Sequence, residues 1–281
     1  MGAKSMRFKR GVQNLLARAG VYERAKVSWV YDFYWNLADK GVIADREREV
    51  EFYGELLRGF RQGDLIFDIG ANQGYKTDIF LRLGARVVAV EPDEASQDIL
   101  KQKFLEYRLN KKKVAIVSKA VSDKCSIQTM WIETPGSAKN TLSKKWAETL
   151  EADEKRFGQK LSFGQIKEVP TLSIEDLVTQ YGSPFFVKID VEGHELSVLR
   201  GMRRPVPYLS FEVNLPEFQS EGRECIEVLG RLAQDGHFNY AADCRTGLML
   251  QQWLPQKEFL VKFDSCIAES VEVFWKAPFK G

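Results

Sequence analysis

A glycine-containing loop after an apolar run is the first stretch of this sequence whose residues could do chemistry. Asp68 ends the apolar run, and Gly70 and Gly74 follow it four residues apart. Glycine at position 70 lets the backbone turn sharply beside a bound nucleoside. Asn72 is expected to cap the helix that begins there, whose exposed amides favour a carboxylate or phosphate. Because the third glycine of a dinucleotide loop is missing, we expect an amino-acid-bearing cofactor whose cationic amino end interacts with Asp68.

Two further polar loops follow the next two apolar runs. Glu91 ends the second run 23 residues beyond Asp68, close to the offset of about 20 residues at which an acid meets ribose hydroxyls. A carboxylate can accept hydrogen bonds from both vicinal hydroxyls, so Glu91 is predicted to bind a ribose. Ser122 and Asp123 follow the third run, where either could meet the exocyclic amine of an adenine. The pair is also ordinary turn chemistry.

A cluster of acids around one histidine follows the most apolar run of the chain. Asp190, Glu192, His194 and Glu195 share one loop, and Glu212 ends the next run. Loops after neighbouring strands of an open parallel sheet line one crevice, so these side chains are expected to face the cofactor. A role in the site is predicted for Asp190, whereas a lone histidine such as His194 is more often structural than catalytic.

From residue 64 onward, short apolar runs alternate with amphipathic segments, which is the pattern of βαβ units and a parallel sheet. Strands are predicted at 65–68, 86–90, 114–118, 127–132, 185–190, 208–213, 239–242 and 272–276. Helices are predicted at 72–83, 94–109, 174–181, 195–201 and 221–236. Ser173 and Asp176 are expected to form a capping box at the start of the third of these helices.

Two segments depart from this alternation. Residues 1–60 are predicted to form a helical N-terminal extension, and residues 61–281 to form the Rossmann-like domain. The aromatic residues at 29–35 in the extension are expected to pack on the domain, with a lid or the surface of a homodimer as the functional alternative. A polar insertion at about 133–168 interrupts the domain. It is expected either to lie over the mouth of the site or to form a mobile surface excursion.

Composition narrows the classes of partner and the cellular location. The chain has 41 basic and 39 acidic residues, a balance that gives no support to nucleic-acid binding. Its four cysteines are scattered, without the spacing of a zinc site or redox motif, which predicts reduced thiols and a cytoplasmic protein. No apolar stretch approaches the ~20 residues of a membrane span, so no integral membrane segment is expected. No resident metal is assigned.

Several of these stretches together resemble the FkbM family of S-adenosylmethionine-dependent methyltransferases. The stretches are DIGANQG at 68–74, VEP at 90–92, AVSD at 120–123, NTLS at 140–143, VPTLS at 169–173, KIDVEG at 188–193 and FE at 211–212. The resemblance implies S-adenosyl-L-methionine as cofactor and a seven-stranded, mostly parallel sheet with helices on both faces and an antiparallel last pair. It also implies methylation of oxygen, on a small-molecule or glycan acceptor. His194 stands where many relatives carry a small residue.

The expected reaction is in-line transfer of a methyl group to an acceptor hydroxyl. Asp190, Glu192 or His194 is predicted to be the general base, with Glu212 positioning the acceptor. A divalent cation bridging Asp190, Glu192 and the acceptor stays open as a less favoured alternative, because carboxylate oxygens are hard ligands. The alternative functions are a nicotinamide-dependent oxidoreductase, for which a third loop glycine and a proton donor are missing, and an inactive cofactor-binding scaffold.

Overall fold

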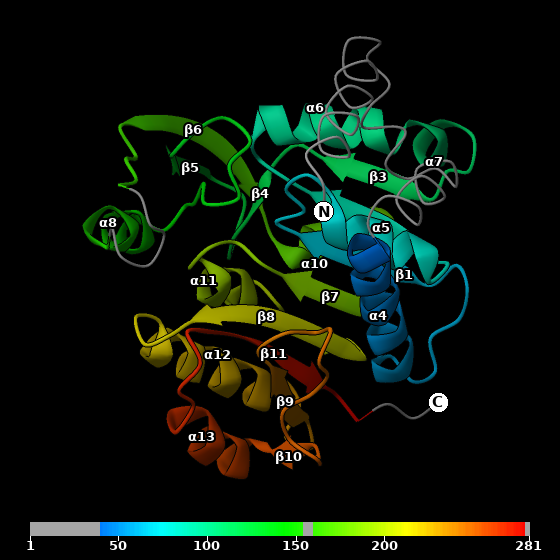
Figure 1. Cartoon of the computed structure of the whole chain (residues 1–281), viewed down its shortest axis with the longest axis vertical. Coiled ribbons are helices and arrows are strands. Elements are labelled where there is room, and N and C mark those ends of the chain that lie inside the picture. Colours follow the sequence, from blue (N-terminus) through cyan, green and yellow to red (C-terminus); the bar gives the residue numbers. More distant parts are fainter. Residues whose placement is uncertain (1–39, 154–159, 279–281) are drawn as a thin grey trace.

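The computed structural model describes residues 40–153 and 160–278, in which one large sheet has helices on both faces (Figure 1). The strands of this sheet are, in spatial order, β10 (Leu254–Pro255), β9 (His237–Ala241), β11 (Ser270–Lys276), β8 (Tyr208–Asn214), β7 (Phe186–Ile189), β1 (Leu65–Ile69), β2 (Arg86–Val90) and β3 (Val114–Val117). From β3 to β8 the pairing is parallel, and β11 pairs antiparallel with both β8 and β9. The predicted Rossmann-like, mostly parallel sheet is confirmed.

The sheet has eight strands in the part of the chain that is described, where seven were expected. The additional strand is β10, which pairs Leu254 and Pro255 with the outer edge of β9. Proline has no N–H to donate to a neighbouring strand, so Pro255 is compatible with a short pairing at the sheet edge but not with a longer one. The other seven strands include the antiparallel last pair that the family resemblance implies.

Alternate residues of the central strands enter two apolar cores on opposite faces of the sheet. Phe67 and Ile69 of β1 enter one core, and Ile66 enters the other. The helices of the first core are α8 (Lys144–Ala152), α10 (Ile174–Tyr181), α11 (Glu195–Arg200), α12 (Gln219–Leu232) and α13 (Gln256–Asp264), and those of the second are α4 (Lys40–Leu56), α5 (Tyr75–Arg82) and α6 (Glu94–Lys103). Strands buried on both faces are apolar throughout, which is why the sequence shows them as continuous runs.

The helix predicted at 72–83 begins later than expected. Asn72 has a φ of 45° and Gly74 a φ of 76°, both in the left-handed region, so neither can belong to the first turn of α5. The helix therefore starts at Tyr75, with Gly74 as its N-cap. The prediction that Asn72 caps this helix is wrong.

Two other predictions about helices have different outcomes. The helix predicted at 94–109 is divided at Phe104 into α6 and α7 (Leu105–Leu109), and the fully buried Phe104 ring lies in the second core. The capping box at Ser173 is confirmed: its hydroxyl accepts from the backbone N–H of Asp176, whose carboxylate accepts from the backbone N–H of Ser173.

The polar segment at 133–168 belongs to a small substructure beside the main sheet. Strands β4 (Ala120–Val121), β6 (Gln165–Leu172) and β5 (Ile127–Ile132) form a three-stranded sheet in that order, and α8 lies beside it (Figure 1). The backbone of Thr141 pairs with that of Trp131 in β5, which holds the segment against the small sheet. The strand predicted at 127–132 therefore exists, but in the smaller sheet.

Helix α4 is held on the second core by one aromatic side chain and by ion pairs. Tyr53 is fully buried, and its ring centroid lies 5.2 Å from that of Phe80 and 5.8 Å from that of Phe186. Arg46 pairs with Asp78 of α5 at 3.3 Å. The aromatic residues at 29–35, and with them the predicted dimer surface, lie outside the described residues. Within 40–153 and 160–278, no helix has the length and apolarity to cross a membrane.

Replacing Tyr53 with alanine should lower the free energy of unfolding by about 3–5 kcal/mol, because it removes a large buried ring. Tyr53→Phe keeps the ring and loses only the hydroxyl, which lies 3.3 Å from Glu272 Oε1, so its cost should be about 1 kcal/mol. Urea denaturation followed by circular dichroism measures both values. Equal destabilisation by the two variants would contradict the proposed anchoring of α4 by the ring.

Candidate active site

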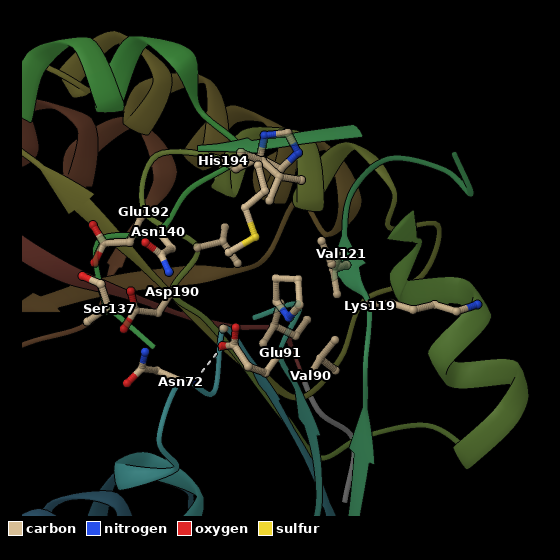
Figure 2. Close-up of a pocket in the computed structure, with 18 residues that line it drawn as sticks. Asn72, Val90, Glu91, Lys119, Val121, Ser137, Asn140, Asp190, Glu192 and His194 are labelled. Atoms are coloured by element: carbon tan, nitrogen blue, oxygen red, sulfur yellow. Dashed lines mark hydrogen bonds between the residues drawn. The ribbon is translucent and has the colours of Figure 1, made fainter. Parts of the chain in front are cut away.

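The loops at the carboxyl ends of β1, β2 and β7 surround a first cavity (Figure 2). It encloses about 640 Å³ including its open mouth. The predicted site residues that line it are Gly70, Asn72, Glu91, Asp190, Glu192 and His194. The wall also includes Lys119, Met130, Ser137, Ala138, Asn140 and Leu142, to which no role in the site was assigned from the sequence.

Gly70 is required by a close backbone approach. It has a φ of +79°, and a Cβ at this position would collide with the carbonyl oxygen of Asp190. The N–H groups of Gly70 and Ala71 both donate to the carbonyl of Val90, which ties the loop after β1 to the end of β2. A bare backbone therefore forms this part of the cavity wall, as a closely approaching nucleoside or amino acid requires.

Asn72 and Gly74 have different places in the loop. The Asn72 side-chain amide lies 3.4 Å from Ser96 Oγ and 3.5 Å from the carbonyl of Gly136, and it lines the cavity. Gly74 does not line the cavity. A Cβ there would overlap the ring of Phe104, so this glycine makes room for α6 and α7 to pack on the loop.

Glu91 joins two loops with its carboxylate. Its oxygens accept one hydrogen bond each from the backbone N–H groups of Asn72 and Asp93, both at 2.8 Å. Burial raises the pKa of Glu91 to about 7. Each carboxylate oxygen can accept more than one hydrogen bond, so a residue placed in this way at the cavity wall can still bind hydroxyl groups.

Asp68 lies beneath the cavity and does not line it. Its side chain is buried, and its Oδ2 accepts a 2.5 Å hydrogen bond from Thr77 Oγ1. Among the described residues its Oδ1 has no hydrogen-bond partner. Burial raises the pKa of Asp68 above its usual value. An unsatisfied buried acceptor under the glycine loop fits a cationic ligand group reached through a bridging water.

Ser122 and His194 form a contact at one side of the first cavity. Ser122 Oγ accepts from Gln128 Nε2 at 3.0 Å and lies 3.1 Å from His194 Nε2. Burial lowers the pKa of His194 to about 4, so its ring is neutral at pH 7. Ser122 and Asp123 do not line the cavity, and His194 lies away from Asp190 in it (Figure 2). The ring is therefore placed for binding and poorly placed to act together with the acids.

A buried lysine holds Asp190 in its ionised form. Lys188 Nζ lies 2.8 Å from Asp190 Oδ2, and the Lys188 side chain is only 4% exposed. Burial alone would raise the pKa of Asp190, but the charges of Lys188 and Lys76 and the hydrogen bonds of Asp190 with Glu212 and Lys188 together lower that pKa below its usual value. The sequence held a signal for this pair, because residues two apart in a strand point to the same face and this strand is otherwise apolar.

Two further acids gather around Asp190. One carboxylate oxygen of Asp190, one of Glu192 and one of Glu212 lie within 4.8 Å of one another. Burial and the charge of Asp190 raise the pKa of Glu192 to about 8 and that of Glu212 well above its usual value. The hydrogen bond between Glu212 and Asp190 also raises the pKa of Glu212 and lowers that of Asp190, so the negative charge of the three acids is concentrated on Asp190.

Two side chains of the segment at 133–168 hold Glu192 in position. Trp146 Nε1 of α8 donates a 2.7 Å hydrogen bond to Glu192 Oε2, and Thr141 Oγ1 donates one of 2.6 Å to the Glu192 carbonyl. Glu192 has a φ of 55°, a left-handed conformation that these contacts help to maintain. Glu195 has a structural role instead, since its Oε1 accepts from the N–H groups of Val191 and Gly193.

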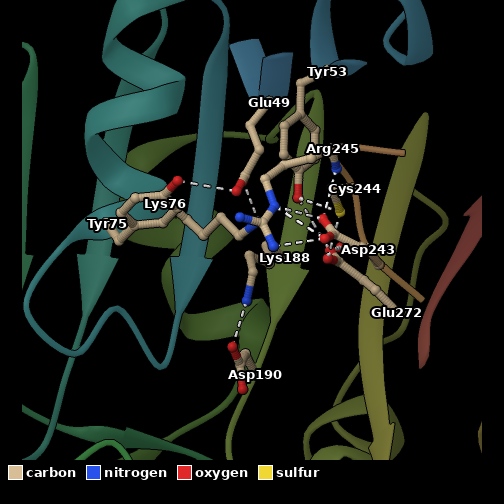
Figure 3. A network of polar contacts seen from close by, with 11 residues as sticks. Glu49, Tyr53, Tyr75, Lys76, Lys188, Asp190, Asp243, Cys244, Arg245 and Glu272 are labelled. Atoms are coloured by element: carbon tan, nitrogen blue, oxygen red, sulfur yellow. Dashed lines mark hydrogen bonds and ion pairs between the residues drawn. The ribbon is translucent and has the colours of Figure 1, made fainter. Parts of the chain in front are cut away.

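A second cavity, about 760 Å³ including its open mouth, adjoins the first at Asp190. Figure 3 shows the network of polar contacts to which many of its lining residues belong. It is bounded by α4, α5, β7, β8, β11 and the loop after β9, and its lining residues are Glu49, Lys76, Lys188, Asp190, Glu212, Ala241, Ala242, Asp243, Cys244, Arg245, Ser270 and Glu272. Glu212, predicted to point into the same crevice as Asp190, therefore lines the second cavity. Its Oε1 accepts a 2.7 Å hydrogen bond from Ser270 Oγ.

Residues 68–238 match the family described as the methyltransferase FkbM domain. The chain belongs to this family. The family and the fold are those of S-adenosylmethionine-dependent methyltransferases. No protein of curated function matches the sequence.

Solved structures that are similar to this chain include two methyltransferases. An FkbM methyltransferase from Methylobacillus flagellatus is 18% identical with a TM-score of 0.43, and the match covers 64% of this chain and 40% of that one. A TehB-like SAM-dependent methyltransferase from Corynebacterium glutamicum is 11% identical with a TM-score of 0.41, with 82% and 87% covered. This chain thus spans less than half the length of the FkbM structure.

Gly70→Ala should weaken binding of S-adenosylhomocysteine at least about 100-fold, the scale of loss that a loop displacement near 1 Å can cause. The added methyl group collides with the Asp190 carbonyl, so the loop must move. Gly63→Ala is the matched control, because Gly63 has a φ of +92° and open space around it. It should cost about 1–2 kcal/mol of stability and leave binding intact. Equal affinities of the two variants in calorimetry would contradict this role of Gly70.

Proposed function

We propose that this protein is an S-adenosyl-L-methionine-dependent methyltransferase that methylates a hydroxyl oxygen of a small-molecule or glycan acceptor. The observation that carries this proposal is the position of Asp190, an ionised carboxylate at the junction of two cavities. One cavity has the wall expected for a nucleoside cofactor, and the other is free for an acceptor. A transferred group has to pass between two bound molecules, and Asp190 lies where they would meet.

The first cavity supplies the groups that this cofactor needs. Glu91 would accept hydrogen bonds from the ribose hydroxyls, and the bare backbone at Gly70 would lie against the amino-acid part, with Asp68 interacting through water. Ser122 and Asp123 would act on the adenine side through His194, which lines the cavity. The sulfonium of S-adenosylmethionine supplies an activated methyl group: the acceptor oxygen bonds to the methyl carbon while the carbon–sulfur bond breaks and its electrons stay on sulfur.

Asp190 is the best placed of the three predicted bases. A base has to reach the acceptor proton first and to have a suitable pKa second, and Asp190 borders both cavities. Lys188 keeps it ionised, and Glu212 beside it would position the acceptor oxygen. Glu192 and His194 line only the first cavity, so neither borders the space in which the acceptor would bind.

Calorimetry with S-adenosylmethionine, S-adenosylhomocysteine, NAD and NADP tests the cofactor assignment. We expect the first two to bind and the nicotinamide dinucleotides to show no binding. The glycine loop lacks the third glycine of dinucleotide-binding loops, and the acidic residue Asp68 lies at its start. Binding of a dinucleotide alone would support the oxidoreductase alternative. The inactive scaffold would be supported if S-adenosylmethionine binds but its labelled methyl group is not transferred to extracts of glycans, lipids or natural products.

The preference for S-adenosylmethionine over S-adenosylhomocysteine should increase as the pH rises through about 8. Only the former carries a sulfonium charge, and Glu192, with a pKa of about 8, is ionised above that pH and attracts a cation. The ratio of the two dissociation constants, measured by calorimetry at several pH values, cancels titration of the amino group that both ligands share. Glu192→Gln should flatten the dependence, while the exposed control Glu51→Gln should follow the wild type. A slope that persists in Glu192→Gln would exclude this residue as its source.

Asp190→Asn should lower the single-turnover rate by about 10²–10⁴-fold, the usual contribution of a general base. Three further variants, Glu192→Gln, His194→Gln and Glu212→Gln, should lower this rate less. The main effect of Glu212→Gln should be on the KM of the acceptor. Rapid-quench measurement of methyl transfer from labelled cofactor gives the rates. If all four variants keep full turnover and normal cofactor binding, none of these residues is the base.

Excess chelator should leave methyl transfer unchanged. The acids Asp190, Glu192 and Glu212 could in principle hold a divalent cation. However, Lys188 already supplies the positive charge beside Asp190, and the raised pKa of Glu212 disfavours the charged form that a cation would need. Loss of activity in chelator, with recovery on addition of Mg²⁺, would instead support the bridging cation.

A further inference from the structure

The two cavities meet at a single side chain. Among the described residues, Asp190 is the only one that lines both the first cavity and the second. Its side chain is 34% exposed, which is consistent with a carboxylate that faces open space. The second cavity is therefore the space that a molecule can occupy next to a ligand of the first one.

We propose that the second cavity is the acceptor site and that it selects a polar acceptor that is neutral or positively charged. This inference rests on the proposed methyl transfer. It adds to that function the place where the acceptor binds and the charge of the acceptor, which neither the family nor the fold specifies.

The lining of the second cavity has no surface for an apolar acceptor. Eight of its twelve residues are charged, and the others are Ser270, Cys244 and two alanines. Neither an aromatic ring nor an aliphatic side chain larger than alanine is among them. Small-molecule sites for apolar ligands are lined mainly by such side chains, so an acceptor here has to be held by hydrogen bonds and charge.

The charge balance of the cavity disfavours an anion. Five acidic side chains, Glu49, Asp190, Glu212, Asp243 and Glu272, face three cations, and the other four acids outnumber the cations even when Glu212 is neutral. Each cation is already ion-paired: Lys76 with Glu49 at 2.5 Å, Lys188 with Asp190 at 2.8 Å, and Arg245 with Asp243 at 2.7 Å. In the described part of the chain, no cation lies within 4 Å of the Glu212 or Glu272 carboxylates. A ligand carboxylate or phosphate would thus add negative charge to a site already in excess.

The walls of the two cavities come from different parts of the chain. Every residue that lines the first cavity lies within the matched range 68–238, whereas eight of the twelve around the second lie outside it. Glu49 comes from α4, and Arg245 comes from the loop after β9 and pairs with Asp45 of α4 at 3.0 Å. The cofactor half is thus built from the family domain and the proposed acceptor half largely from flanking segments, as expected when relatives share a cofactor and differ in acceptor.

The test uses the full chain with labelled S-adenosylmethionine and five probe acceptors: methyl glucoside, glucosamine, glucuronate, octanol and naphthol. We expect turnover of the neutral or the amino sugar to exceed that of glucuronate by about tenfold or more, since like charges oppose binding. Octanol and naphthol should not be methylated. Turnover of the apolar alcohols, preference for glucuronate, or no turnover of either polar probe overturns the assigned acceptor class.

A blocking variant tests the location. Ala242 is an exposed residue of the lining, so Ala242→Trp should fill the second cavity and lower turnover at least about 100-fold. Val261→Trp, at a 68% exposed position on α13, is the matched control and should behave as the wild type. Full turnover in Ala242→Trp overturns the location.

Binding of S-adenosylhomocysteine separates the failures. If Ala242→Trp binds it as the wild type does, the variant is folded and its loss of turnover belongs to the acceptor site. If the wild type itself does not bind it, the proposed methyl transfer has failed, which is a different result from a wrong acceptor site.

Discussion

The buried ion pair of Lys188 and Asp190 is the interaction on which the electrostatics of the site depend. Lys188 lies on a central strand between two apolar cores, where an unpaired ammonium group would be very unfavourable. Removing one partner of such a pair typically costs about 3–5 kcal/mol, because the other charge stays buried. Lys188 therefore favours the ionised form of Asp190, and burial together with the charge of Asp190 raises the pKa values of Glu192 and Glu212.

Asp190 also links this charge to the geometry of the site. Its carbonyl oxygen meets the bare backbone of Gly70, while its side chain reaches both cavities. A shift of the loop after β7 would thus change the glycine loop and the position of the carboxylate at once. Close contact of this kind transmits displacements directly, because a packed interior has little free volume.

The sequence was informative wherever function follows from the end of a strand. Parallel strands bring their carboxyl ends to one edge, so Gly70, Glu91 and Asp190 could be placed around one cavity before the fold was known. Local capping chemistry was equally readable at Ser173. The conformation of Asn72 could not be predicted in the same way. Its left-handed backbone depends on how its N–H binds the Glu91 carboxylate of the neighbouring loop.

Contacts between residues that are far apart in the sequence could not be predicted, because no local sequence pattern indicates them. Asp45 and Arg245 are 200 residues apart and yet pair beside the second cavity. The support of Glu192 by Trp146 spans 46 residues and comes from a segment that is polar and irregular in sequence. The full burial of Trp146 depends on how α8 packs, which hydrophobic periodicity does not determine.

The ion pair between Arg245 and Asp45 has a consequence for how the specificity of this protein could change. It connects α4 to the loop after β9, so these two segments form one rim of the second cavity. Substitutions in the rim can reshape one cavity without reaching the glycine loop or the Lys188–Asp190 pair. New specificities could therefore be grafted onto this scaffold by replacing the two segments together, and replacing one alone would break their shared ion pair.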